Sequence, residues 1–141
     1  MKKVRITVNG VARSMPESTA ENIELLTDGQ YSHTSGESVL TYAESELTGM
    51  EGVLTTFSVN KQGVITLTRE GEINSVMVFE PGKKQTILYD SPYGVTALGV
   101  NTIKANSLLN KTGGELELEY VLDAGNLRVG FNSFKIKVQP M

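Results

Sequence analysis

The segment Glu115-Leu116-Glu117-Leu118-Glu119-Tyr120 alternates a carboxylate with a large apolar side chain at every position. Neighbouring side chains on an extended backbone point to opposite faces, so this period of two predicts a β-strand with one wet face and one buried face. The same alternation occupies Val4–Val8 near the other end of the chain. The sequence therefore predicts a protein built from half-buried strands.

Eight further segments are rich in Val, Ile, Thr, Tyr and Phe, the residues that fit a pleated surface. They are Ile23–Thr34, Ser38–Leu47, Val53–Val59, Val64–Glu70, Ile73–Glu80, Thr86–Asp90, Val95–Leu109 and Leu127–Val138. Short turn signals with Gly, Asn, Asp or Pro separate them. Because parallel strands need a crossover of roughly a dozen residues, these short turns predict an antiparallel meander.

Length and composition limit the classes of protein to which the chain can belong. The chain has 141 residues, with 13 Lys and Arg, 16 Asp and Glu, and no Cys. That length fits one domain over residues 1–141. The formal net charge of −3 argues against duplex DNA or an anionic membrane as a partner, since both require clustered positive charge. The absence of Cys excludes disulfides, thiolate catalysis and thiolate metal sites.

The first residues predict a cytoplasmic protein. Lys2 and Lys3 suit the start of a signal peptide, but Val4–Thr7 contains Arg5 where an apolar core of about 7–15 residues is required. No apolar run approaches the roughly 18 residues of a membrane-spanning helix. The lack of Cys also fits a reducing compartment.

Several glycines fall inside the strand patterns. Asn9-Gly10 and Asp28-Gly29 fit hairpin turns, whereas Gly99 and Gly130 fit bulges or sharp bends in longer strands. Long strands that coil are what a closing barrel needs. The pattern therefore favours a single antiparallel β-barrel, with a β-sandwich as the alternative.

Five segments follow one another in a familiar order: Tyr42–Gly49, Leu67–Gly71, Met77–Phe79, Tyr89–Gly94 and Leu116–Tyr120. In this order they resemble the YwiB-like family of small bacterial proteins, a domain of unknown function, and the likeness extends across essentially the whole chain. The resemblance implies a lipocalin-like (calycin-type) up-and-down β-barrel of about eight main strands. It implies no established activity, catalytic residue or cofactor. The resemblance therefore makes the predicted fold more specific and leaves the function open.

The alternation also carries two opposite charges toward the predicted barrel interior. Tyr42 and Glu44 share one face of their strand, and Leu67 and Arg69 share one face of theirs. A charge in an apolar interior is costly unless it is paired and hydrogen-bonded. We therefore predict that Glu44 and Arg69 are internal partners, with a hydroxyl from Tyr42 or Tyr120.

Two interpretations of this pair remain open. It lies at a barrel end, partly in water, or it supplies polar anchors in an apolar ligand cavity. The low aromatic content of 6% modestly favours a cavity, because a small barrel either fills with side chains or holds one small ligand. An interior void of several hundred Å³ would support a ligand site, whereas a core filled at normal packing density would exclude one. The predicted ligand-binding residues are Tyr42, Glu44, Arg69, Met77, Phe79 and Tyr120.

Other chemistry-bearing residues have plainer explanations. Glu44 and Glu46, about 6.5–7 Å apart on one strand face, could act as acid and base, but this spacing occurs in any β protein. The single His, His33, is expected to be exposed and is too isolated for a triad or a metal site. The lysines of Lys83–Lys84 and Lys135–Lys137 are expected on solvated edges rather than in a nucleic-acid site.

The sequence thus predicts a non-enzymatic β-barrel that binds a small, mostly apolar molecule. The alternatives are a filled barrel that serves as a structural or protein-interaction module, and an enzyme of unknown chemistry. We expect no catalytic residue, cofactor, metal or nucleic acid. A weak closing edge could also support a homodimer.

Overall fold

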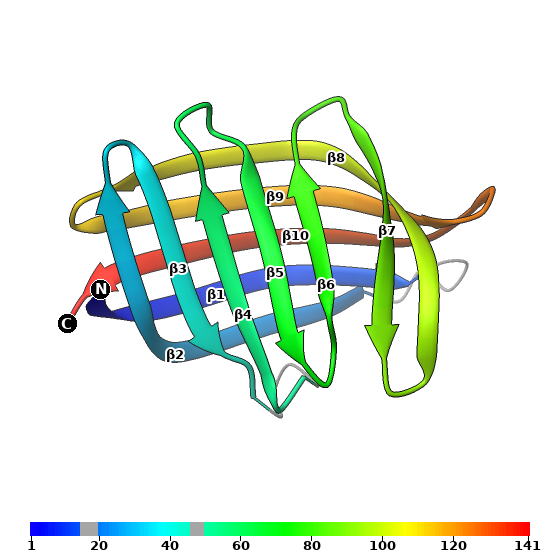
Figure 1. Cartoon of the computed structure of the whole chain (residues 1–141), viewed down its shortest axis with the longest axis horizontal. Helices are drawn as coiled ribbons and strands as arrows, with labels where there is room; N and C mark the ends of the chain where they lie inside the picture. Colours follow the sequence, from blue (N-terminus) through cyan, green and yellow to red (C-terminus); the bar gives the residue numbers. More distant parts are fainter. Residues whose placement is uncertain (15–19, 46–49) are drawn as a thin grey trace.

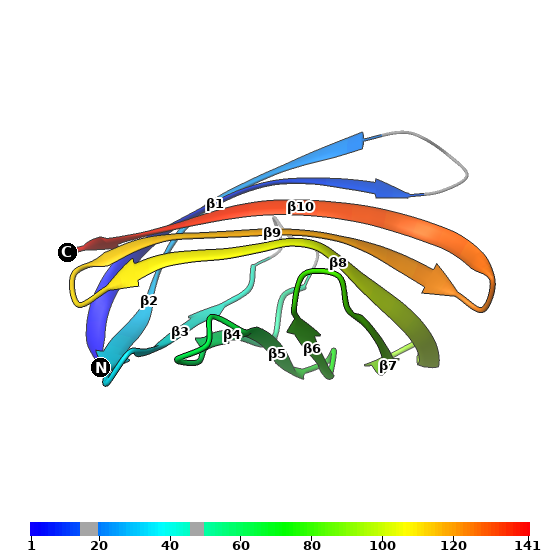
Figure 2. The ribbon, with the colours of Figure 1, turned by 90° about the horizontal axis from the view of Figure 1, so that it is seen from above.

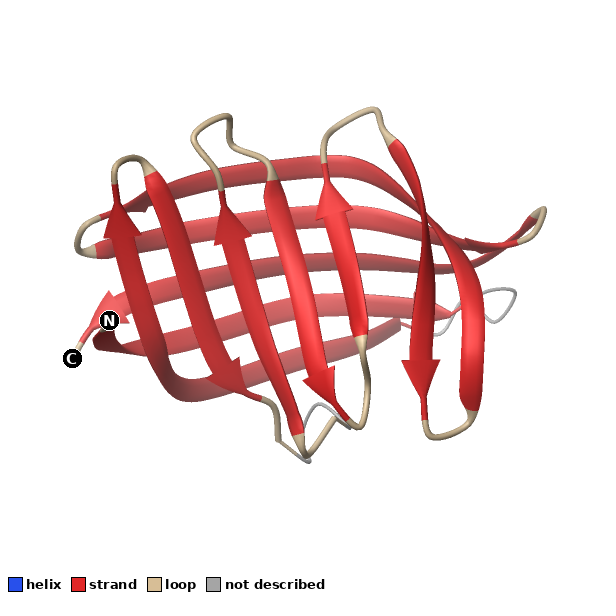
Figure 3. Ribbon diagram, in the orientation of Figure 1, coloured by secondary structure: helices blue, strands red, loops and turns tan. Residues whose placement is uncertain are grey.

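The computed structural model describes residues 1–14, 20–45 and 50–141, and within these ranges every regular element is a β-strand (Figures 1 and 3). The strands are β1 (Lys2–Ser14), β2 (Ala20–Thr34), β3 (Glu37–Ala43), β4 (Val53–Val59), β5 (Ile65–Gly71), β6 (Ser75–Phe79), β7 (Lys84–Ser91), β8 (Gly94–Asn110), β9 (Gly113–Ala124) and β10 (Leu127–Pro140). Each strand predicted from the sequence overlaps one of these ten. The predicted end of one strand at Leu47 lies outside the described residues.

The ten strands form one antiparallel sheet in the order β6-β5-β4-β3-β2-β1-β10-β9-β8-β7. Strands that follow one another in sequence lie side by side, and β1 also pairs with β10. This is the up-and-down topology that the short turns predict, and the barrel prediction is confirmed. The family resemblance implies about eight main strands, whereas the structure has ten.

The curled sheet has two walls when it is viewed from above (Figure 2). The long strands β1, β10, β9 and β8 form one wall, and the short strands β3 to β6 form the other. β2 and β8 bend from one wall into the other at opposite ends of the molecule (Figure 1). The inner faces of the two walls enclose the core.

Apolar side chains at alternate strand positions fill the space between the walls. In Glu115–Tyr120 the leucines and the tyrosine are buried and the glutamates lie on the outer face, as predicted. The burial of such side chains is the main favourable contribution to folding, at about 25 cal/mol for each Å² of apolar surface removed from water. The most deeply buried apolar residues include Ile6, Tyr31, Leu40, Ile65, Leu67, Phe79, Leu116, Leu118 and Ile136.

The barrel closes incompletely between β6 and β7, the two edges of the sheet. The backbones of Asn74 and Asp90 exchange two hydrogen bonds, of 2.8 and 3.0 Å. Further along, the backbone N–H of Val78 donates to the side-chain oxygen of Gln85 at 2.8 Å instead of to a backbone carbonyl of β7. No continuous ladder joins β6 to β7, both of which are fully described. We call the gap between these two strands the seam.

Two predictions about turns are wrong. Gly10 and Gly29 lie inside β1 and β2, and the ladder between these strands runs through both of them. A side chain at position 29 would collide with the side chain of Ile6 and the carbonyl oxygen of Thr41. Glycine is therefore required there by close packing and not by a turn.

The two glycines predicted to mark bulges or bends behave differently. The register of β10 against β9 shifts between Arg128 and Gly130, which confirms a bulge at Gly130. Gly99 lies in unbroken register with both of its neighbouring strands. The shift in β8 falls between Thr102 and Lys104 instead. Glycine content alone therefore does not locate the irregularities of this sheet.

The described ranges contain no helical segment with the length and hydrophobicity that a membrane crossing would require.

Candidate functional site

A row of polar side chains crosses the inner face of the short-strand wall. The strand registers pair Tyr42 of β3 with Thr55 of β4, Thr55 with Arg69 of β5, and Arg69 with Ser75 of β6. Paired residues on neighbouring strands point to the same face of a sheet. The four side chains therefore face the core together with buried Leu67. We call Tyr42, Thr55, Arg69 and Ser75 the polar row.

Glu44 lies just beyond the end of β3, where its backbone N–H donates to the carbonyl oxygen of Val53 at 2.9 Å. Its side chain is only 8% exposed, as the alternation predicts. The hydroxyl of Thr55 donates to a carboxylate oxygen of Glu44 at 2.8 Å, and this carboxylate also raises the pKa of the Tyr42 phenol. Hydrogen bonds of this kind compensate for the burial of a charge.

The predicted direct pair between Glu44 and Arg69 is wrong. The ion pairs among the described residues do not include one between these two side chains. The register supplies the reason, because Thr55 lies between Tyr42 and Arg69 in the polar row and takes the position next to Glu44. Tyr42 lies close enough to both side chains for the charge of Glu44 to raise its pKa and the charge of Arg69 to lower it.

Two neighbours in the polar row carry polar atoms with no partner. The Nε of Arg69 and the Oγ of Ser75 are both buried and make no hydrogen bond within the described part of the chain. Ser75 as a whole is only 6% exposed. Most buried donors in proteins are hydrogen-bonded, so an unpartnered group of this kind requires an explanation. These two lie directly opposite each other on β5 and β6.

The phenols near Arg69 stay protonated at neutral pH. Burial raises the pKa of Tyr42 above its usual value of 10.0, the charge of Glu44 raises it further, and the charge of Arg69 lowers it. Burial also raises the pKa of Tyr120, against the opposing effect of Arg69. Both tyrosines are thus hydrogen-bond donors and not bases in this environment.

A cavity of about 50 Å³ lies between the polar row and the opposite wall. Tyr42, Glu44 and Arg69 line it, as predicted for an interior site. By volume it holds a few water molecules and is far smaller than the void of several hundred Å³ that a hollow barrel would offer. The remaining lining residues are Val8, Ile23, Leu25, Met50, Phe57, Leu67, Leu118, Phe134 and Ile136.

The other three predicted ligand-binding residues lie in the packed core and not around this cavity. Met77, Phe79 and Tyr120 are almost fully buried. The rings of Phe79 and Tyr120 pack against each other with their centroids 4.8 Å apart. Tyr120 lies close enough to Arg69 to be affected by its charge. The structure therefore brings Tyr42, Glu44 and Arg69 together around the cavity. Met77, Phe79 and Tyr120 lie in the packed core instead.

A second hollow, of about 540 Å³, opens along the seam. Arg69 lines this hollow as well as the interior cavity, so one side chain borders both spaces. Ser75 and Gln85 also line it.

The candidate residues predicted from the sequence do not include Ser75 and Thr55. The alternation of β6 and β4 nevertheless places both on the buried face.

Met50 lines both the interior cavity and a third hollow, of about 290 Å³. Tyr89, which packs against the core, and the fully exposed Tyr93 also line this third hollow, which we call the end hollow. An unbranched thioether adapts its shape more easily than other core side chains. Met50 is therefore an adaptable side chain shared by the two spaces.

His33 is half-buried instead of exposed, which corrects the sequence prediction. Its Nδ1 lies 2.7 Å from the Oγ of buried Ser38. The hydroxyl of Tyr31 donates to the carbonyl oxygen of Asn110 at 2.6 Å and lies 3.3 Å from the same Ser38 oxygen. These bonds tie β2, β3 and the end of β8 together at the barrel end.

Glu46, the other half of the predicted carboxylate pair, lies outside the described residues.

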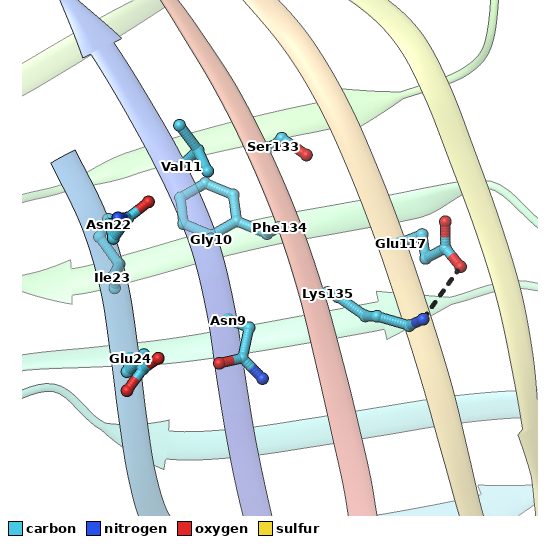
Figure 4. A pocket seen from close by; sticks show the side chains of 10 residues that line it. All are labelled: Asn9, Gly10, Val11, Asn22, Ile23, Glu24, Glu117, Ser133, Phe134 and Lys135. Carbon is cyan, nitrogen blue, oxygen red and sulfur yellow. Dashed lines mark ion pairs between the residues drawn. The ribbon is translucent and has the colours of Figure 1, made fainter. Parts of the chain in front are cut away.

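The outer face of the long-strand wall carries charges of both signs. An open hollow of about 420 Å³ there is lined by Asn9, Glu24, Glu117 and Lys135, among others (Figure 4). Lys135 lies 3.9 Å from Glu117, as the dashed line in Figure 4 shows. Lys84 similarly lies 3.8 Å from a carboxylate oxygen of Asp123. Lys84 therefore lies on the edge strand β7, as predicted, whereas Lys135 lies on β10 in the middle of the sheet and not at an edge.

Metal ligands do not cluster anywhere in residues 1–14, 20–45 and 50–141, because no group of three or more His, Asp or Glu side chains there is arranged to hold an ion.

Comparisons with known proteins identify the family. The model of the family described as "Domain of unknown function (DUF1934)" matches residues 6–136. Among solved structures, the crystal structure of the ywiB protein from Bacillus subtilis matches with a TM-score of 0.75, over 97% of this chain and 93% of that chain, at 20% sequence identity. No curated protein matches the chain. The resemblance to the YwiB-like family is thus confirmed, and the chain belongs to the DUF1934 family of domains of unknown function.

Proposed function

We propose that this protein is a non-enzymatic barrel that binds a small, mostly apolar molecule, with Tyr42, Glu44 and Arg69 as its polar anchors. The observation that carries the proposal is the buried Nε of Arg69, which has no hydrogen-bond partner among the described residues and belongs to a side chain that lines a largely apolar cavity. An unsatisfied buried donor costs about 1–3 kcal/mol, and more when the group is charged. A ligand oxygen beside Arg69 would remove that cost.

The size of the cavity limits the ligand. About 50 Å³ accepts a chain of only a few carbon atoms in the present packing. Longer chains require the lining side chains to move, and Met50 is the most adaptable of those shared with the end hollow. The proposal therefore favours short ligands in the wild-type protein.

The surroundings of Glu44 favour binding over catalysis. Its carboxylate accepts a hydrogen bond from Thr55, so it is held as an acceptor inside the protein. The raised pKa of Tyr42 keeps that phenol protonated at neutral pH. A general base must reach the proton that it removes, and the Glu44 carboxylate is already engaged by the hydroxyl of Thr55.

The test uses three four-carbon compounds: sodium butyrate, 1-butanol and butylammonium chloride. Each is titrated into the ¹⁵N-labelled protein, and the amide signals of Leu67 and Leu118, which line the cavity, are followed by NMR. We expect at least one compound to shift these signals saturably. The amide of exposed Leu26, on the outer face of β2, is the internal control and should not move. If none of the three compounds moves the lining signals, the proposed function is wrong.

A second candidate is a protein-interaction module that pairs through the seam. The edges of β6 and β7 lack a ladder between them, and Val76 and Leu88 are exposed beside the gap. Open sheet edges readily pair with strands of another chain, including a second copy of the same chain. Light scattering at rising concentration tests for this homodimer: the wild type should dimerise and Leu88→Lys should stay monomeric. A wild-type monomer at every concentration contradicts it.

A further inference from the structure

We infer that the polar end of the ligand is a carboxylate, held between Arg69 and Ser75 on the inner side of the seam. This inference rests on the proposed function and names the chemical class of its ligand. It depends on Ser75 as well as on Arg69, and Ser75 is not among the ligand-binding residues predicted from the sequence.

The two groups form a matched set of donors. Arg69 and Ser75 are direct cross-strand partners, so their β-carbons lie about 4.5–5.5 Å apart. The Nε of Arg69 and the Oγ of Ser75 are both buried and unpartnered within the described chain. A carboxylate accepts hydrogen bonds from a guanidinium and a hydroxyl together, and bonds to charged groups are the stronger kind. An ammonium group has no acceptor to offer either donor.

Charge also favours a carboxylate despite the presence of Glu44. The Glu44 carboxylate bonds to Thr55, and Thr55 lies two strands away from Ser75. Two strand spacings amount to about 9.6 Å. Coulomb energy falls with distance. The attraction between a bound carboxylate and the adjacent Arg69 guanidinium is therefore stronger than its repulsion from the more distant Glu44 carboxylate. Glu70 lines the outer side of the seam hollow, where it is exposed and screened by water.

The two spaces beside Arg69 suit the two ends of such a molecule. The interior cavity is lined mainly by apolar side chains and would take a short hydrocarbon tail. The seam hollow gives access from solvent to Arg69 and Ser75. Among the described residues that line either space, Arg69 is the only cation, so the site is matched to a monoanion and not to a dianion. The ligand class is therefore a small monocarboxylic acid.

The experiment compares dissociation constants for sodium butyrate, 1-butanol and butylammonium chloride, taken from the amide shifts of Leu67 and Leu118 at pH 7 and constant ionic strength. We expect butyrate to bind at least about tenfold more tightly than the other two compounds. Arg69→Met should weaken butyrate binding at least about tenfold, and Ser75→Ala by about three- to tenfold. Thr102→Val is the matched control, because Thr102 also has a buried, unpartnered hydroxyl but lines neither space. It should bind butyrate as the wild type does.

The outcomes separate the inference from the proposed function. If the alcohol or the amine binds as tightly as the acid, or if Arg69→Met and Ser75→Ala leave butyrate binding unchanged, the carboxylate inference is wrong and the binding function stands. If no compound shifts the amide signals of Leu67 and Leu118, the proposed binding function and the carboxylate inference are both wrong. The dispersion of the amide spectrum shows whether Arg69→Met is folded, and Ser75→Ala decides the question if it is not.

Discussion

Asn74 and Asp90 are bound to each other by two backbone hydrogen bonds that join the edge strands of the sheet. Toward the other end of the seam, the loop after β6 bonds to β8 through Gly82, Lys83 and Thr102, with two bonds of 3.2 Å. Between these points the side chain of Gln85 takes the place of a ladder. Closure of the barrel therefore depends on a small number of bonds, while the other neighbouring strands share continuous ladders.

Replacing Gln85 by alanine should weaken the seam. The substitution leaves the backbone N–H of Val78 without its acceptor, so we expect the free energy of unfolding to fall by about 1–2 kcal/mol. Urea denaturation measures the change. Gln62→Ala, in an exposed turn, is the matched control and should have no effect. Equal stability of the two variants would show that the Gln85 side chain does not hold the strands together.

Two buried threonines should respond oppositely to the same substitution. Thr55→Val removes the hydroxyl that donates to Glu44, and hydrogen bonds to charged groups contribute about 1.5–3 kcal/mol. Thr102→Val removes a hydroxyl without a described partner, so stability should stay the same or rise. Thermal and urea unfolding of both variants check the contrast. A Thr102→Val protein that loses as much stability as Thr55→Val would overturn this assignment of the hydrogen bonds.

A methyl group at Gly29 should be poorly tolerated. The new β-carbon would collide with Ile6 and with the backbone oxygen of Thr41, and forced repacking of a core costs about 1–3 kcal/mol or more. Gly130→Ala is the control, since the nearest atom to its added carbon, the carbonyl oxygen of Arg13, lies at an ordinary distance of 3.6 Å. Unfolding curves should show a large loss for Gly29→Ala and little change for Gly130→Ala. Similar stabilities would mean that β2 and β3 are not packed so closely.

The buried phenol of Tyr42 should make the protein sensitive to alkali. Its pKa is higher in the folded protein than in the unfolded chain, so above pH 10 the unfolded chain releases this proton first. The contribution to stability is therefore complete below pH 10 and is lost as the pH rises. At pH 11 the loss is about 1.4 kcal/mol for one such phenol.

The comparison that isolates this effect is the change in unfolding free energy between pH 8 and pH 11. Tyr42→Phe should lose less stability over this range than the wild type, whatever its stability at pH 8. Tyr93→Phe removes a fully exposed phenol and should behave as the wild type does. Identical pH dependence in all three proteins would contradict a raised pKa at Tyr42.

The sequence predicts which side chains are buried better than it predicts their partners. Alternation correctly places Tyr42, Glu44 and Leu67 inside, because the two-residue period is a local property of extended backbone. The pairing of Glu44 with Arg69 depends on which strand lies between them and in which register. Neither is visible in one strand's pattern, so Thr55 was overlooked as the neighbour of Glu44.

Turns show a similar limit. Asn9-Gly10 has the composition of a hairpin turn, yet Gly10 pairs with Ile23 and with Phe134 inside a long strand. The contacts of both neighbouring strands outweigh the local preference for a turn. The seam was also beyond prediction in detail, because its closure by Gln85 and by the bridge between Asn74 and Asp90 depends on how the whole sheet curls.

The most direct measurement of the central claim is the NMR signal of the Nε–H group of Arg69, assigned by its loss in Arg69→Lys. The account predicts that this proton exchanges with water much more slowly than that of exposed Arg128, and that its signal moves saturably when butyrate is added. A signal that exchanges as fast as that of Arg128 and does not respond to butyrate would contradict a buried, unpartnered Nε in Arg69 that binds a ligand carboxylate.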